Sequence, residues 1–176
     1  MVFDVHMRIG RTVAGELREK NTRLWRKVFL LGCVFPDFLP HFPGHSIDKS
    51  QKLFDRLYHI LSRRRRGRFS GARIRAVDSF LMGVLSHYAA DYSCAAHQPH
   101  YTENMRRHMR YERDMSRFLK RNPQTLRRSF EAPAARIAAA AGLPRRLCES
   151  LTYHKCDNFA DELTYAVDAV RMVCGC

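Results

Sequence analysis

Two pairs of side chains share a spacing that suits metal binding. His87 is followed four residues later by Asp91, and His108 is followed four residues later by Glu112. On a helix, residues four apart are neighbours on one face, displaced by about 40° around the axis. An imidazole and a carboxylate so placed can bind a divalent ion, preferably Zn²⁺, with bonds of about 2.0–2.2 Å. For an isolated pair, a hydrogen bond between the two side chains in the core is the alternative.

A further histidine lies between the two pairs. His97 ends the stretch SHYAADYSCAAH, which is otherwise apolar and small, as expected of a buried helix. Pro99 should end that helix, and a turn over residues 98–102 would fold the next helix back antiparallel. The turn could then bring His97 together with His108 and Glu112. Polar groups are costly to bury unless they are compensated, and a shared metal site would compensate them.

The elements that must position these residues are helices. Apolar residues recur every three to four positions, and strand-like alternation is hard to find, so the sequence predicts an all-α fold. We expect one multi-helix domain over residues 1–176, because this length is sufficient for a single sizeable core. The helices are expected at residues 3–20, 23–34, 47–62, 72–96, 103–121, 123–141, 144–153 and 158–173.

The ordered series of ligand-type residues resembles the zinc-dependent phospholipases C, an all-helical family whose catalytic domain holds three zinc ions in one cleft. The resemblance spans roughly residues 6–112, with the segment from His87 to Glu112 as its most specific part. It implies two to three Zn²⁺ ions and a ligand set of eight residues. These are His6, Asp37, His45, His87, Asp91, His97, His108 and Glu112.

The resemblance also implies how three zinc ions would divide these ligands. The first would bind the HxxxD pair together with Asp37 and a histidine shortly after it. The second would bind His97 and the HxxxE pair. The remaining zinc would take His6 and share Asp91 as a bridging carboxylate.

Two ligand positions have alternatives. The histidine after Asp37 is His41 or His45; His45 is favoured because the family leaves a longer gap there and because a loop can aim a histidine just before a new helix. In secreted family members, an N-terminal tryptophan completes the site that contains His6. This chain begins MVFDV, so Asp4 could replace that tryptophan as an oxygen ligand, with a solvated acidic side chain as the alternative.

Such a centre suits phosphodiester hydrolysis. One zinc ion lowers the pKa of a bound water toward 7, while others neutralise the phosphate and the leaving oxygen. Asp37 is the candidate catalytic residue that orients or deprotonates this water, or it serves purely as a ligand; the family permits both. The resemblance implies phospholipid as the substrate.

The charge of the chain favours an anionic partner. Lys and Arg number 31 against 17 Asp and Glu, a formal net charge of +14, and arginine suits planar oxyanions such as phosphate. The arginine-rich run at 63–68 is expected to be a solvated interhelical loop, or else a patch for phosphate or anionic lipid. With Arg106 and Arg107 it would attract anionic membranes, at about 1 kcal/mol per basic residue.

Two other classes of function remain open. Single-strand-specific zinc nucleases share the helical trizinc architecture, and the positive charge would favour nucleic acid. In those nucleases the second pair of ligands four residues apart normally ends in Asp and lies further along the chain. Here the second pair ends in Glu112 and follows after a short gap. The non-enzymatic alternative is a basic helical module that binds an anionic surface or nucleic acid and uses zinc only for its fold.

The N-terminal residues and the cysteines bear on where in or outside the cell the protein is found. The first residues lack the apolar core of a signal peptide, and no apolar run approaches the ~20 residues of a membrane span. The six cysteines lack CxxC spacing, which favours reduced thiols. We therefore expect a cytoplasmic protein, or a secreted one if the N-terminus is incomplete. Oligomeric state is left open.

Overall fold

The part of the chain that the structure describes is helical. The computed structural model describes residues 3–17, 23–39, 44, 47–66, 76–98, 104–127 and 158–175, and within these ranges it contains no strand. The all-α prediction is confirmed. The α-helices are α1 (Phe3–Glu16), α2 (Arg23–Phe38), α3 (Ile47–Arg66), α4 (Ala76–Tyr92), α5 (Met105–Arg121) and α8 (Phe159–Cys174), with 3₁₀ turns η2 (Ala95–His97) and η3 (Pro123–Arg127).

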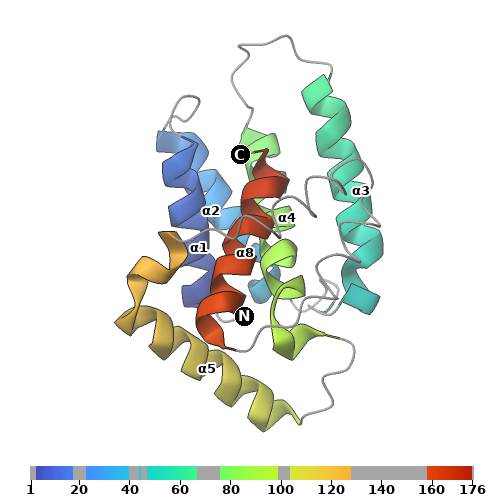
Figure 1. Ribbon diagram of the computed structural model, residues 1–176. Helices are drawn as coiled ribbons and strands as arrows, with labels where there is room; N and C mark the ends of the chain where they lie inside the picture. The colour runs from blue at the N-terminus through green and yellow to red at the C-terminus, as the bar shows by residue number, and fades with distance from the viewer. Residues whose placement is uncertain are drawn as a thin grey trace.

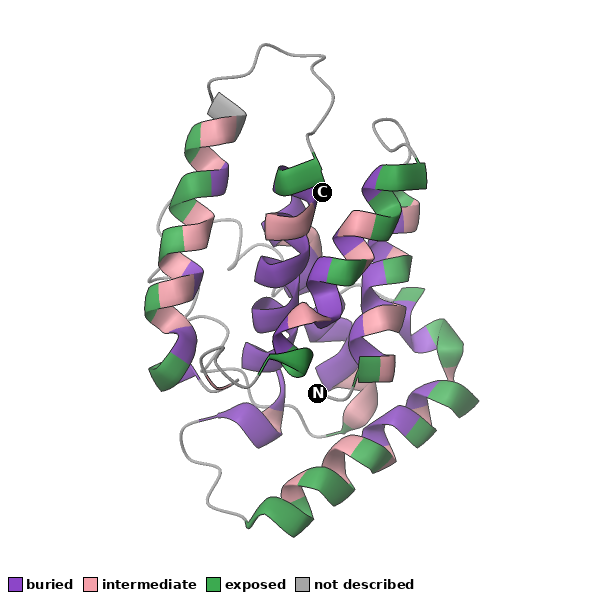
Figure 2. Ribbon diagram, turned by 180° about the vertical axis from the view of Figure 1, so that it is seen from behind, coloured by how far each residue is buried: buried purple, intermediate pink, exposed green. Residues whose placement is uncertain are grey.

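Helix α4 forms the centre of the fold. Every residue from Met82 to Tyr92 is buried, and α4 packs against α2, α8 and α3 (Figures 1 and 2). Helices α3 and α5 are buried along one side only, and α5 crosses the end of the bundle at which α1 begins. Among the described helices, none is both long enough and apolar enough to cross a membrane.

Helices α2 and α4 touch through their main chains. A Cβ atom added at Gly83 would lie 2.2 Å from the carbonyl oxygen of Phe29, and one added at Gly32 would lie 2.3 Å from that of Phe80. Only glycine permits such an approach, because any other residue would place a side-chain carbon inside the neighbouring helix. The separation of these two helices is therefore set by backbone contact.

The expected helix 72–96 is interrupted. Helix α4 ends at Tyr92, and the chain turns before η2 begins. The Ser93 hydroxyl donates to the carbonyl of Ala89 at 2.8 Å, and the side-chain amide of Gln98 donates to the carbonyl of Tyr92. These bonds satisfy carbonyls that lose their helical partners at the break. The prediction of one continuous helix was wrong because side-chain contacts replace the backbone ladder there.

Two helices extend beyond their expected ends. Helix α2 continues four residues past 34, because Pro36 removes one N–H donor without ending the last turn. Helix α3 continues to Arg66, so the start of the arginine-rich run is helical rather than the expected loop. Arg64 Nε lies 2.5 Å from Oδ1 of the buried Asp78, which ties the last turn of α3 to the start of α4.

Other boundaries fit the sequence prediction to differing degrees. Helix α1 ends at Glu16 rather than at residue 20. Helices α5 and α8 begin after the N-caps Asn104 and Asn158, close to the expected 103–121 and 158–173, and Gly175 ends α8 with a φ of 73°. Of the expected helix 123–141, the described part is η3. The expected helix 144–153 lies outside the described residues.

Candidate metal centre

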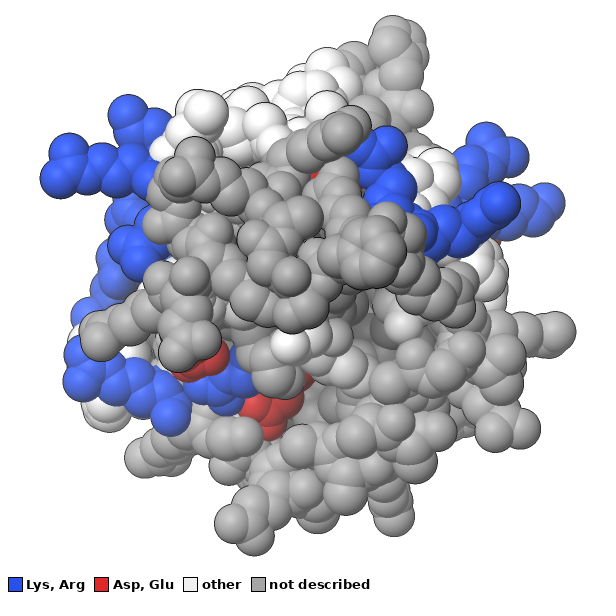
Figure 3. Space-filling view, turned by 90° about the horizontal axis from the view of Figure 1, so that it is seen from above, with Lys and Arg blue, Asp and Glu red and all other residues white. Residues whose placement is uncertain are grey.

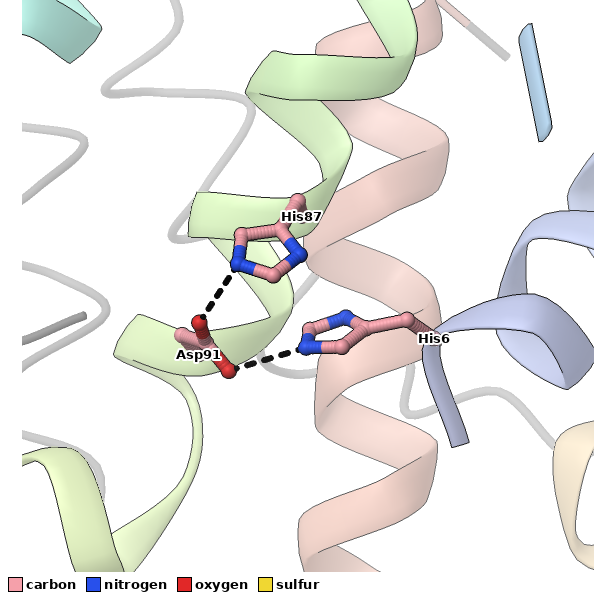
Figure 4. A group of neighbouring side chains, drawn as sticks. All are labelled: His6, His87 and Asp91. Atoms are coloured by element: carbon pink, nitrogen blue, oxygen red, sulfur yellow. Dashed lines mark ion pairs between the residues drawn. The ribbon is translucent and has the colours of Figure 1, made fainter. Parts of the chain in front are cut away.

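Three buried side chains from two helices meet in the core. His6 comes from α1, and His87 and Asp91 lie one turn apart on α4 (Figure 4). The Nε2 atoms of His6 and His87 lie 3.1 Å from Oδ1 and Oδ2 of Asp91, respectively. The two imidazole rings are stacked with their centroids 4.0 Å apart. We call these residues the first donor group.

A backbone contact fixes the ring of His87. Its Nδ1 lies 3.0 Å from the carbonyl oxygen of Cys33 on α2. A carbonyl can only accept, so Nδ1 carries the proton in this hydrogen bond, and in the neutral ring Nε2 keeps the lone pair. That lone pair faces Asp91. Metal-binding histidines commonly have this arrangement, in which one ring nitrogen donates to a carbonyl and the other binds the ion.

The charges in the first donor group favour a bound cation. Burial lowers the pKa of His6 to about 3, which leaves its ring neutral near pH 7. Burial acts to raise the pKa of Asp91, but nearby positive charge more than offsets this and holds it well below its usual range. Among the described residues, His6 Nε2 has no aligned hydrogen-bond partner despite its closeness to Asp91. An ionised carboxylate beside the neutral ring of His6 would be balanced by a divalent ion.

A second donor group lies beside the first. His97 comes from η2, and His108 and Glu112 lie one turn apart on α5. Glu112 Oε1 is 3.3 Å from His97 Nε2 and 3.2 Å from His108 Nε2. Burial lowers the pKa of His97 to about 4. Burial acts to raise the pKa of Glu112, but the hydrogen bond with His97 and nearby positive charge lower it to about 2.

The break after α4 joins the two groups. On a continuous helix, His97 would lie about 240° around the axis from Asp91 and would face another side of the helix. The turn into η2 instead brings His97 Nε2 to 3.4 Å from Asp91 Oδ1. Asp91 therefore contacts imidazoles from three elements, and both donor groups belong to one centre.

The spacing of the donor atoms fits zinc. In a tetrahedral site with bonds of about 2.0–2.1 Å, neighbouring ligand atoms lie roughly 3.4 Å apart. The imidazole–carboxylate separations within each group are 3.1 to 3.3 Å. In each group the three potential ligand atoms all lie within 4.8 Å of one another. Imidazole nitrogen and carboxylate oxygen are the donors of catalytic zinc sites.

The remaining predicted ligands are placed differently. Asp37 lies in the last turn of α2, partly exposed, with Oδ1 3.9 Å from His87 Nε2, so it borders the first group without closing it. His41 and His45 lie outside the described residues. Asp4 accepts hydrogen bonds from Arg8 and Ser116, at 3.1 and 3.0 Å, and belongs to neither group. These contacts favour a structural role for Asp4.

The sequence reasoning did not identify Glu162. The residue is 2% exposed, and its carboxylate accepts hydrogen bonds from the backbone N–H of Ala95 in η2 and from the Tyr111 hydroxyl of α5. In the sequence, Glu162 is an acidic residue in the first turn of a helix, which is a common surface position. No local pattern could have linked it to a turn 67 residues away.

The fold and the two donor groups define an all-helical protein with a candidate zinc centre at the junction of α1, α4, η2 and α5. The chain belongs to the zinc-dependent phospholipase C family: the model of that family, described as zinc dependent phospholipase C, matches residues 5–165 of 176. The match extends into α8, well beyond the segment of 6–112 expected from the ligand series. Neither a curated protein nor a solved structure matches the chain. At the level of the family, the chain is a zinc-dependent hydrolase.

Proposed function

We propose that this protein hydrolyses the phosphodiester bond of phospholipids and releases a phosphorylated head group. The observation that carries the proposal is the 3.4 Å approach of His97 to Asp91, which joins two zinc-type donor groups in a member of the phospholipase C family. Bound zinc would supply a water of lowered pKa and neutralise the phosphate. We propose at least two ions, one in each donor group.

The residues of the chain have separate roles in this proposal. The first donor group would hold one ion, with His87 oriented by the carbonyl of Cys33. The second donor group would hold another, and Asp91 lies between them. Asp37 is the candidate base: it borders the first group, and its side chain is 21% exposed, so it can contact a water that enters from solvent. It would orient that water or accept its proton.

Exposed apolar side chains beside the centre support a lipid substrate. Phe38 follows Asp37 directly and is 63% exposed, and the ring of Phe3 packs edge-to-face against it at 5.7 Å. Met109 follows His108 directly and is 61% exposed. Such side chains can enter the apolar part of a lipid surface. Nucleic acid offers no comparable environment for them outside base stacking.

The positive charge supports an anionic substrate without choosing between lipid and nucleic acid. Arg106 and Arg107 are exposed on α5 near the second donor group. Lysine and arginine side chains also stand out around the end of the molecule seen in Figure 3, away from α5. Because the charge is spread this widely, it would attract membranes and nucleic acids alike.

A comparison of turnover tests the proposal. The zinc-loaded protein is incubated with vesicles of phosphatidylcholine and phosphatidylglycerol, and with single-stranded DNA and RNA at the same ionic strength, with chelator-treated protein as the blank. We expect zinc-dependent release of phosphorylated head group to exceed strand cleavage. Cleavage of single strands without action on phospholipid would favour the nuclease alternative. Inactivity of the zinc-loaded protein on all substrates would favour a binding module.

A further inference from the structure

The carboxylate of Glu162 links the two elements that carry the second donor group. One oxygen accepts from the backbone N–H of Ala95, the first residue of η2, and the other accepts from the hydroxyl of Tyr111 on α5. Ala95 lies two residues before His97, and Tyr111 lies next to Glu112.

Both linked elements need such support. Turn η2 has three residues and lies between a broken helix end and residues of extended conformation. Helix α5 is buried only along the side of Met115, Ser116 and Leu119, in its C-terminal half. Its site-bearing half meets α8 through Tyr111, whose ring packs edge-to-face on Phe159 at 5.1 Å. Glu162 acts at that same contact.

We infer that Glu162 is a positioning residue for the second donor group: by holding η2 to α5 from the first turn of α8, it sets the distance between His97 and the His108–Glu112 pair. This inference rests on the zinc site of the proposed function. Groups that orient metal ligands from outside the coordination sphere typically contribute about 10- to 100-fold to metal affinity. Removing the carboxylate would also leave the partly buried N–H of Ala95 without this acceptor.

Zinc affinity, measured apart from turnover, tests the inference. Wild-type protein, Glu162→Ala and Glu162→Gln are titrated with Zn²⁺ against a chelator of known affinity. His108→Ala serves as the reference that identifies the ion of the second donor group. We expect Glu162→Ala to weaken the binding of that ion by about 10- to 100-fold and to leave the affinity for the first ion unchanged. Glu162→Gln should restore most of the affinity, because its amide oxygen can accept from Ala95 and its NH₂ can donate to the tyrosine oxygen.

The matched control removes another buried acid from the same helix. Asp168 is 5% exposed and bonds Arg171 at 2.6 Å in the C-terminal part of α8. Asp168→Ala should lower the thermal stability of the zinc-free protein without changing either zinc affinity. If only helix stability mattered, Asp168→Ala and Glu162→Ala would weaken zinc binding alike, and the inference would be wrong.

Further outcomes separate this inference from the proposed function. If Glu162→Ala does not fold, Tyr111→Phe decides the question. It removes the hydrogen bond from the Tyr111 hydroxyl to Glu162 and should weaken the binding of the same ion to a smaller extent. Unchanged affinity for the second ion, in Glu162→Ala or in the Tyr111→Phe that replaces it, would overturn the inference. A wild-type protein that binds zinc without cleaving phospholipid would contradict only the proposed function. A wild-type protein that binds no zinc would contradict both.

Discussion

His97 Nε2 lies 3.4 Å from Asp91 Oδ1, although the two residues are six positions apart and would face different sides of a continuous helix. The same nitrogen lies 3.3 Å from Glu112 Oε1. His97 therefore stands between the carboxylates of the two donor groups. Its removal should affect both groups, whereas removal of a ligand at the outer edge should affect one.

His97→Ala should lose the zinc of the second donor group and also weaken zinc binding by the first. His108→Ala should lose only the second ion, because His108 pairs with Glu112 of the second donor group, at 3.2 Å. His59→Ala, at an exposed position of α3, is the control and should keep both ions. Zinc per chain after dialysis, measured by elemental analysis, distinguishes the three variants. Identical zinc contents and affinities in His97→Ala and His108→Ala would show that the two groups bind independently.

Asp37→Asn should reduce hydrolysis by about 10²-fold or more while the fold is kept. An amide cannot accept the proton of a water, and Asp37 is partly exposed at the border of the first donor group, so little packing is lost. Turnover and the thermal unfolding midpoint are measured together. Asp48→Asn, at an exposed position of α3, is the matched control and should change neither. Wild-type turnover in Asp37→Asn would exclude it as the base.

The zinc-free protein should lose stability as the pH falls from about 6.5 to 4. An unfolded histidine takes up its proton near pH 6.5, whereas burial lowers the pKa of His97 to about 4 and that of His6 to about 3 in the folded state. The unfolded chain thus binds more protons in this window, and the free energy of unfolding decreases on acidification. Glu112, with a pKa of about 2, continues the trend below pH 4.5.

Urea unfolding of the zinc-free protein between pH 7.5 and 4.5 measures this dependence. His97→Gln should show a shallower decrease, because one of the histidines that stay neutral in the fold is gone. Stability that stays constant or increases on acidification would contradict the assignment of neutral, buried imidazoles.

Gly83→Ala should lower the free energy of unfolding by about 1–3 kcal/mol or more, because its Cβ would lie 2.2 Å from the Phe29 carbonyl oxygen, and a main-chain atom cannot move aside as a side chain can. Gly15→Ala in α1 is the control. An added Cβ meets nothing there within 4 Å, and alanine is the better helix former, so stability should hold or rise by up to about 1 kcal/mol. Equal stability of both variants, measured by urea unfolding, would argue against direct backbone contact between α2 and α4.

The features that the sequence could predict are those set by the spacing of residues that lie close together along the chain. The all-α fold and the two i, i+4 pairs follow from helical periodicity, and the ordered series predicted the family. The break after Tyr92 could not be predicted, because Gln98 and Glu162 stabilise it through contacts outside the helix, the second from far along the chain. The Gly32–Gly83 approach likewise depends on pairing between helices. Zinc binding by the eight proposed ligands, His45 among them, stays a prediction.

The backbone contact between α2 and α4 also bears on which ions the centre could accept. The wall formed by these two helices carries Asp37, His87 and Asp91, and at Gly32 and Gly83 its two helices are in main-chain contact, where no side chain can repack to change their separation. The opposite wall is formed by α1, η2 and α5, which hold His6 and the second donor group. Adaptation to an ion larger than Zn²⁺ must therefore come from that wall, so the position of η2 and α5 against α1 would set which ion sizes the centre accepts.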